Sequence, residues 1–397
     1  MRESCLDAVV DAIPDEMPGR ARIEALLALS FETRHRDPEQ MFRLAGGAHV
    51  VAINLRSTRY TPAERADLQA RAWAELANAQ RRNEWFSEAE HSLGEAARCQ
   101  KAGSGDLLLL ARLLDVQASL RIDQRRLEEA AALLDTVHEL YRDAGETHLA
   151  GRALISKGTS MVYDDKPHEA VGLLREGLSK LEPQRDPQLH ATGQMTLLIA
   201  LESSGEWRKA RRLLLESGLR KTFAAEPLVL LKLRWLEARI FAGLSKLKRA
   251  EEIFSEVEDG FLAAGLEYEA ALASLERADV LVRMGRAAEV EALAEEALKT
   301  FQGLGVGREA VRAVRFLHEA CRQKRRTRAL CARWSASSRS TRAGRTYDLS
   351  PRRSSSTRKS ASRTFWSRSS AAFSSFTWRP WTSRYCSTSG SGGPGWG

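Results

Sequence analysis

Apolar positions recur along this chain with a period of about 40 residues. Six small apolar residues stand 41, 40, 40, 40 and 40 residues apart, and another apolar residue follows each of them four positions later. A fixed period of roughly 20 to 50 residues is typical of stacked repeats, in which one supersecondary unit recurs. We call these six positions the ladder: Ala89, Ala130, Ala170, Ala210, Ala250 and Val290.

Each repeat predicts two antiparallel helices joined by a short polar turn. Twelve positions before each ladder residue stands a small or apolar residue, such as Gly158 before Ala170, where a small side chain lets two helix backbones approach closely. Three predicted second helices end on an aromatic residue with a glycine four positions later, and a glycine there closes a helix in the left-handed conformation. These pairs are Tyr141/Gly145, Phe261/Gly265 and Phe301/Gly305.

The periodicity divides the chain into three parts. Residues 1–61 predict a short helix over Cys5–Ile13 and a degenerate first repeat with helices over 21–33 and 38–54. Residues 62–324 hold six regular repeats, which must stack because one unit cannot bury its apolar face alone. Alternating β-branched runs are nearly absent. The predicted fold is all-α, a right-handed α-solenoid of stacked antiparallel helix pairs, followed by a tail over 325–397.

The repeats resemble the tetratricopeptide repeat family across roughly residues 62–305. The first unit carries the resemblance best, through Trp73, Leu76, Ala77, Ala89, Leu93 and Ala96. The period here is 40 residues, against about 34 in the family, so the helices are expected to be longer. Repeats of this length also look like the helical sensor regions of some bacterial signalling proteins.

The resemblance implies a ligand groove lined by the first helix of each unit. Aligned on the ladder, the second motif positions include four basic residues, and a row of them would suit a carboxylate-bearing or acidic peptide because guanidinium binds carboxylate bidentately. An alternative is that Glu75, Asp115 and Glu237 on neighbouring helices neutralise them. The candidate residues are Arg71, Arg112, Arg152 and Lys232 at the second positions, with Asn78, Ser119, Thr159 and Arg239 at the ninth.

Catalytic motifs are not found in the sequence. A phosphate-binding loop is absent, since Lys157-Gly158-Thr159 follows Gly151 in the wrong order, and neither His-Glu-x-x-His nor Gly-x-Ser-x-Gly occurs. The five cysteines form no Cys-x-x-Cys, which predicts reduced thiols rather than a zinc site or a disulfide framework. We therefore expect no enzyme activity, no cofactor and no metal.

The last part of the chain differs sharply from the rest. Residues 322–397 carry 17 Lys+Arg and one acidic residue, whereas residues 1–321 carry 44 and 51. This serine-, arginine- and tryptophan-rich composition predicts disorder. It also allows single-stranded nucleic acid to bind by phosphate neutralisation and stacking. A shift of reading frame near residue 325 accounts best for the abrupt loss of acidic residues, and we favour it.

These observations predict a non-catalytic scaffold or adaptor that binds a protein or peptide in its groove. Two alternatives stay open: a sensor module of a bacterial signalling or transcription regulator, and nucleic-acid binding through the basic tail, which we regard as the weaker. The longest apolar run, over 107–114, is broken by Arg112 and is too short to cross a membrane. A cytoplasmic location and no membrane partner are therefore expected.

Overall fold

The structure is a computed structural model that describes residues 19–34, 37–55, 59–305, 313–316, 318 and 322. The predicted helix over Cys5–Ile13 and the tail over 325–397 lie outside the described residues. The chain divides into two compact units, unit 1 up to Gly193 and unit 2 from Gln194 onward, so that the division falls within one helix.

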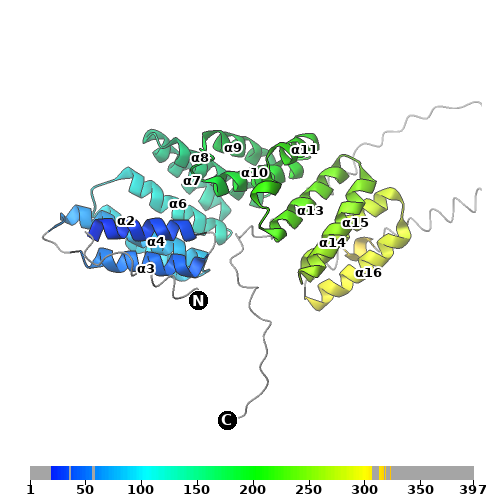
Figure 1. The fold of residues 1–397 in the computed structure, drawn as a ribbon, viewed down its shortest axis with the longest axis horizontal. Coiled ribbons are helices and arrows are strands. Elements are labelled where there is room, and N and C mark those ends of the chain that lie inside the picture. The colour runs from blue at the N-terminus through cyan, green and yellow to red at the C-terminus, as the bar shows by residue number, and fades with distance from the viewer. Residues whose placement is uncertain are drawn as a thin grey trace, which may run out of the picture. The chain divides into compact units, whose positions relative to one another are not determined.

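Fifteen helices, α2 to α16, are described from end to end, and no strand occurs in the described residues (Figure 1). They alternate between first and second members of successive pairs. The first helices are α2 (Gly19–Thr33), α4 (Pro62–Arg82), α6 (Leu107–Asp123), α8 (Thr147–Tyr163), α10 (Pro187–Ser203), α13 (Pro227–Gly243) and α15 (Glu267–Met284). The second helices are α3 (Pro38–Ile53), α5 (Phe86–Lys101), α7 (Leu127–Asp143), α9 (Pro167–Lys180), α11 (Trp207–Glu216), α14 (Leu247–Ala263) and α16 (Ala287–Gly303), and a short α12 (Leu219–Thr222) follows α11.

The ladder fixes the register of the second helices. From α5 onward, each second helix that carries a ladder residue begins three residues before it, and all six ladder side chains are fully buried. The pairs α4/α5, α6/α7, α8/α9, α13/α14 and α15/α16 pack along their lengths. The all-α fold of stacked antiparallel pairs is therefore confirmed, and the small buried side chains explain how the paired helices approach.

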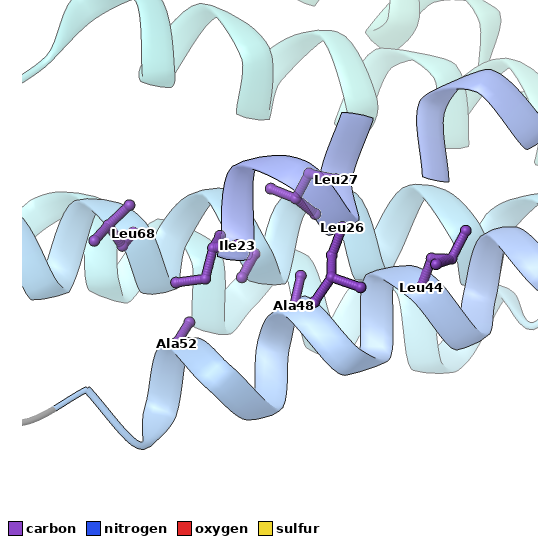
Figure 2. Close-up of a cluster of buried hydrophobic side chains, with 8 residues drawn as sticks. Ile23, Leu26, Leu27, Leu44, Ala48, Ala52 and Leu68 are labelled. Atoms are coloured by element: carbon purple, nitrogen blue, oxygen red, sulfur yellow. The ribbon is translucent and has the colours of Figure 1, made fainter. Parts of the chain in front are cut away.

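The N-terminal pair is held to α4 by an apolar cluster. Ile23 and Leu26 of α2 extend towards Ala52 and Ala48 of α3, and Leu68 of α4 belongs to the same cluster (Figure 2). This packing joins the degenerate first repeat to the regular ones.

Capping sets the starts of the two helices that follow α2. The side chain of Asp37 accepts a hydrogen bond from the backbone N–H of Gln40 at the start of α3. Thr61 forms a capping box with Glu64 at the start of α4, and each of them satisfies a backbone N–H that the helix leaves unpaired.

The helix ends predicted from aromatic–glycine pairs are confirmed. Gly145, Gly265 and Gly305 all have positive φ just after their helices. At the first of them the backbone N–H of Glu146 donates to the carbonyl of Tyr141 at 2.9 Å, which satisfies a carbonyl that the helix leaves unpaired. The glycine thus lets the chain turn directly into the next first helix.

The turn inside each pair also uses a left-handed residue, but glycine occupies it in only two of six repeats. Positive φ occurs at the same repeat position throughout, and a side chain there costs about 1–2 kcal/mol of steric strain. The six residues are Glu84, Arg125, Asp165, Gly205, Ser245 and Gly285.

We predict that Gly177→Ala destabilises unit 1 by about 2 kcal/mol or more, although alanine is the better helix former. A Cβ atom at Gly177 of α9 would lie 2.8 Å from the carbonyl oxygen of Gly151 on α8 and 2.9 Å from Cγ1 of Ile155. The first of these is a backbone atom, which no change of rotamer can remove, so the two helices must separate. Overpacking of this kind costs about 1–3 kcal/mol, and the lost close contacts add to it.

Gly172→Ala on the same helix provides the control. No atom lies within 4 Å of a Cβ placed at Gly172, so only the helix propensity changes and stability should rise by up to about 1 kcal/mol. Urea denaturation followed by circular dichroism would measure both variants. If Gly177→Ala lowers the free energy of unfolding and Gly172→Ala raises it, the close approach of α8 and α9, and not the loss of a glycine as such, causes the destabilisation. A stabilising Gly177→Ala would contradict this explanation.

Candidate functional site

A cleft of about 670 Å³ lies in unit 1 along the first helices. Side chains from α2, α4, α6 and α8 line it, together with residues at the starts of α6 and α8. First helices of a stacked repeat share one face, which is why residues at equivalent repeat positions come together here. The cleft is therefore a candidate binding site of unit 1.

Three of the predicted groove residues line this cleft. Arg71, Arg112 and Arg152 lie on α4, α6 and α8 at equivalent repeat positions, and all three belong to its wall. Arg71 is exposed, whereas Arg112 and Arg152 are partly buried. The row of arginines expected from the ladder therefore exists within unit 1.

The predicted ninth-position residues of unit 1 do not line the cleft. Asn78 is 8% exposed, and its side-chain oxygen accepts hydrogen bonds from the guanidinium of Arg81 at 2.9 and 3.3 Å. The hydroxyl of Thr159 donates back to the carbonyl of Ile155 at 2.8 Å within its own helix. Ser119 is partly buried on α6 and is not part of the cleft wall either.

The remaining two candidates, Lys232 and Arg239, lie on α13 in unit 2. Lys232 is partly buried, and burial lowers the pKa of its ammonium group despite the nearby carboxylate of Glu269. Arg239 is 1% exposed and donates to Glu202 at 2.9 Å, so the expectation that it faces a ligand needs correction. Its physical role is to neutralise buried carboxylates.

Arg112 and Arg152 are held by acidic residues from neighbouring helices. Arg112 donates to both carboxylate oxygens of Glu75, at 2.6 and 2.8 Å, and to Asp115 at 3.2 Å. Arg152 donates to the same oxygen of Asp115. The neutralising pairs that the sequence left open are therefore present for Glu75 and Asp115.

The third acidic residue of that alternative, Glu237, has other partners. It accepts hydrogen bonds from Arg220 at 2.7 Å and from Arg234 at 2.6 Å. Both arginines lie in unit 2, outside the predicted row of groove residues.

The pKa values of Glu75 and Tyr141 are both shifted at this ionic network. Burial alone would raise the pKa of Glu75, but the Arg112 guanidinium outweighs it and the pKa falls below its ordinary value. Burial raises the pKa of Tyr141, and Asp115 adds to the effect, so that it reaches about 12. Both groups therefore keep one protonation state across the physiological range, and the network is a fixed polar floor rather than a proton-transfer site.

Arg34 and Asp186 form another ion pair close to the network. Nη2 of Arg34 lies 2.7 Å from Oδ2 of Asp186, and the guanidinium lies 3.6 Å from the centre of the Phe31 ring. Burial lowers the pKa of Arg34, while Asp186 opposes this shift. The pair joins the end of α2 to the start of α10, two segments 152 residues apart in sequence.

Arg71 differs from the other two arginines of the row. Its side chain is exposed, lines the cleft, and makes no hydrogen bond or ion pair with any residue that the structure describes. A guanidinium in that situation keeps its donors available for a carboxylate, which it can bind with two parallel hydrogen bonds. Arg71 is the cleft cation best placed to contact a ligand.

Of the acidic residues of the cleft, the sequence prediction had named only Glu75. The wall contains five arginines but also six carboxylates, so the surface is mixed in charge rather than a positive stripe. The six carboxylates belong to Glu24, Glu64, Asp67, Glu75, Asp106 and Glu146. Three of these residues, Glu64, Asp106 and Glu146, stand at the N-cap or in the first turn of a first helix, where a carboxylate interacts favourably with the helix dipole, and that position could have indicated them.

Apolar side chains complete the cleft. Leu27 and Phe31 of α2 lie in the wall with Leu108 of α6 and Leu149 of α8, and Leu108 is 40% exposed. In the part of the chain that is described, no cluster of three or more His, Cys, Asp or Glu could hold a metal ion. The cleft therefore offers charged and apolar contacts along an extended path.

No described helix combines the length and the apolar character needed to cross a membrane.

Solved structures with the same kind of helical stacking are similar to this chain. A Rap protein complexed with competence and sporulation factor matches with a TM-score of 0.53 and 9% identity, covering 76% of this chain and 85% of that chain. NprR in complex with its cognate peptide NprX matches with a TM-score of 0.50 and 14% identity, covering 78% and 84%. At these identities the likeness concerns the fold, a solenoid of tetratricopeptide-like helix pairs.

No protein-family model matches the sequence, and no curated protein does.

Proposed function

We propose that the unit 1 cleft binds a peptide segment and that the protein acts as a non-catalytic, peptide-binding scaffold or regulator in the cytoplasm. The single observation that carries this proposal is the exposed Arg71 in an extended cleft of about 670 Å³ whose neighbouring arginines, Arg112 and Arg152, are already held in place. A preorganised wall lowers the cost of ordering side chains on binding. The two fold neighbours support the proposal, since one of them was solved with its cognate peptide.

The charges of the wall define the peptide that would fit. A carboxylate, from a side chain or from the C-terminus of the peptide, would pair with Arg71, and donors elsewhere on the peptide would meet the acidic residues at Asp67 and Glu146. Apolar side chains would pack against Leu108 and Leu149. An acidic peptide is one form of such a ligand, and a peptide carrying both charges suits the mixed wall better.

The second candidate function is that of a sensor module in a bacterial signalling or transcription regulator. In such a module, the peptide would shift the protein between two conformations, and it can do so only if it binds one of them more tightly than the other. Both candidate functions require that a peptide binds in the cleft, so one binding experiment tests both.

We predict that Arg71→Glu weakens peptide binding about tenfold or more without loss of folding. Peptides selected from a random dodecapeptide library on the full chain would be titrated by fluorescence anisotropy. Loss of a charge-assisted hydrogen bond and repulsion of the ligand carboxylate account for an effect of this size. Arg71 is preferable to Arg112 and Arg152, because reversing those charges would place new carboxylates beside Glu75 and Asp115.

The matched control is Arg175→Glu. Arg175 is an exposed arginine on α9 that makes no ion pair in the described residues of the chain and does not line the cleft. Equal affinity of both variants and the wild-type protein for every selected peptide would overturn the proposal, as would the absence of any selected peptide.

A further inference from the structure

Helix α11 of unit 2 has a charge opposite to that of its counterparts. Of its ten residues four are basic and one is acidic. By contrast, α7 carries five acidic and one basic residue, α14 five and two, and α16 four and one. Helix α5 carries three acidic and two basic residues, and α9 carries two of each. Among the described second helices that carry a ladder residue, only α11 is net positive.

Three of the four basic residues of α11 line a cleft of about 590 Å³. Arg208, Arg211 and Arg212 line it together with Lys246, which lies just before α14, and the single acidic residue of its wall is Glu216. All four cations are exposed, and none of them forms an ion pair within the described ranges.

One aromatic ring beneath the cations helps to hold two of them. The guanidinium of Arg211 lies 5.9 Å from the centre of the Phe241 ring, and the ammonium of Lys246 lies 6.0 Å from it. Cations at such distances are attracted to the face of an aromatic ring, but they keep their hydrogen-bond donors for other partners.

Helix stability does not explain these charges. Arg208 lies in the first turn of α11, next to the positive end of the helix dipole, where an acidic residue would be favourable. Arg208 also stands three and four residues before Arg211 and Arg212, a spacing at which like charges repel. The three arginines of α11 therefore stand in an unfavourable local setting without a carboxylate partner, and a negatively charged ligand would supply one.

An apolar contact lies beside the cations. Leu215 lines the cleft and is 66% exposed, and Leu244 from the end of α13 lies in the same wall. α11 ends at Glu216, and Gly218, with a φ of 66°, turns the chain into α12. Leu215 stands five residues after the ladder residue Ala210, a position that is also exposed in α5, α7, α9 and α16, so its side chain faces solvent.

We infer that this cleft is a docking site for an acidic segment of a partner protein that carries an apolar anchor residue. Carboxylates of the segment pair with Arg208, Arg211 and Arg212, which can each bind them bidentately. The apolar side chain packs against Leu215 and Leu244. A nucleic acid fits less well, because single strands need aromatic side chains on which bases stack, and no aromatic residue lines this cleft.

The test uses the full chain and a fluorescein-labelled peptide of ten glutamates interrupted by two leucines. We expect the wild-type protein to bind it, binding to weaken about tenfold or more in Arg208→Glu/Arg211→Glu, and about 500 mM NaCl to weaken it as well. Replacing the two leucines of the peptide by serines should weaken binding by about threefold or more. The double variant should keep its thermal stability, because Arg208→Glu improves the interaction with the helix dipole.

The matched control is Lys101→Glu/Arg175→Glu, which reverses two exposed charges on α5 and α9 in unit 1. Equal loss of binding in both double variants would overturn the proposal, since the attraction would then be general. Absence of binding to the wild-type protein would also overturn it. Tighter binding of a short oligothymidine that is lost in Arg208→Glu/Arg211→Glu would assign the cleft to nucleic acid instead. This docking site is independent of the peptide cleft proposed for unit 1.

Discussion

Arg239→Met is expected to destabilise unit 2 by about 3–5 kcal/mol at pH 8. Methionine fills a similar volume, but it leaves Glu202 and Glu276 buried together without a counter-charge, and removing one member of a buried ionic group costs about this much. Urea denaturation followed by circular dichroism at about pH 8 and pH 5 would measure it. The cost should shrink at the lower pH, where Glu202, whose pKa burial raises to about 7, can take up a proton.

The control for this variant is Arg249→Met in the same unit. Arg249 donates to Glu252 at 2.9 Å, but both side chains are half exposed on the surface of α14. An ion pair of that kind contributes at most about 1 kcal/mol. A cost at Arg239 no larger than the cost at Arg249 would contradict the assignment of Arg239 as the neutralising group.

The repeat spacing explains why Arg239 is buried rather than open to a ligand. Glu202 stands 37 residues before it and Glu276 37 residues after it, so both neighbouring first helices present a carboxylate to its guanidinium. Arg239 Nη2 lies 2.9 Å from Glu202, and its Nε lies 3.9 Å from Glu276. The indole N–H of Trp235 donates to Glu276 at 2.9 Å. The ninth motif position is thus polar but internal in this repeat.

Much of the fold was predictable because it depends on local and repeated constraints. The ladder residues Ala170 and Ala250 are fully buried, and their helices begin at Pro167 and Leu247, as the period indicated. A helix of fixed pitch places equivalent residues on equivalent faces, so one register extends to the other repeats. The early end of α11 was not predicted, although Ser217-Gly218 is a signal for a helix end.

The candidate site was predictable only in part, because contacts between repeats depend on how side chains reach across neighbouring helices. The register placed Arg71, Arg112 and Arg152 in one cleft. It left open whether Glu75 and Asp115 neutralise them, and the structure shows that Arg112 pairs with Glu75 and Arg152 with Asp115, each 37 positions earlier. The same separation of 37 residues recurs between Arg239 and Glu202. A residue on one first helix therefore contacts the residue that stands 37 positions earlier, on the preceding first helix, rather than the one a full 40-residue repeat earlier.

The buried carboxyl of Glu202 gives unit 2 a pH dependence with a definite sign. Burial raises the pKa of Glu202 to about 7 from an ordinary value of 4.5, with Arg239 opposing the shift and Glu276 adding to it. Between these two values the folded protein holds a proton that the unfolded chain has released. Stability contributed by this group is therefore greatest below pH 4.5 and falls as the pH rises towards 7.

Glu202→Gln should consequently stabilise the protein at alkaline pH. Glutamine resembles the protonated acid and escapes the loss that ionisation of Glu202 causes. We expect the variant to be more stable than the wild-type protein by about 3 kcal/mol at about pH 8.5, and by less than about 1 kcal/mol at about pH 5. Urea denaturation of both proteins at the two pH values would measure the difference. A variant less stable than the wild-type protein at the higher pH would show that the ionised Glu202–Arg239 pair is itself stabilising.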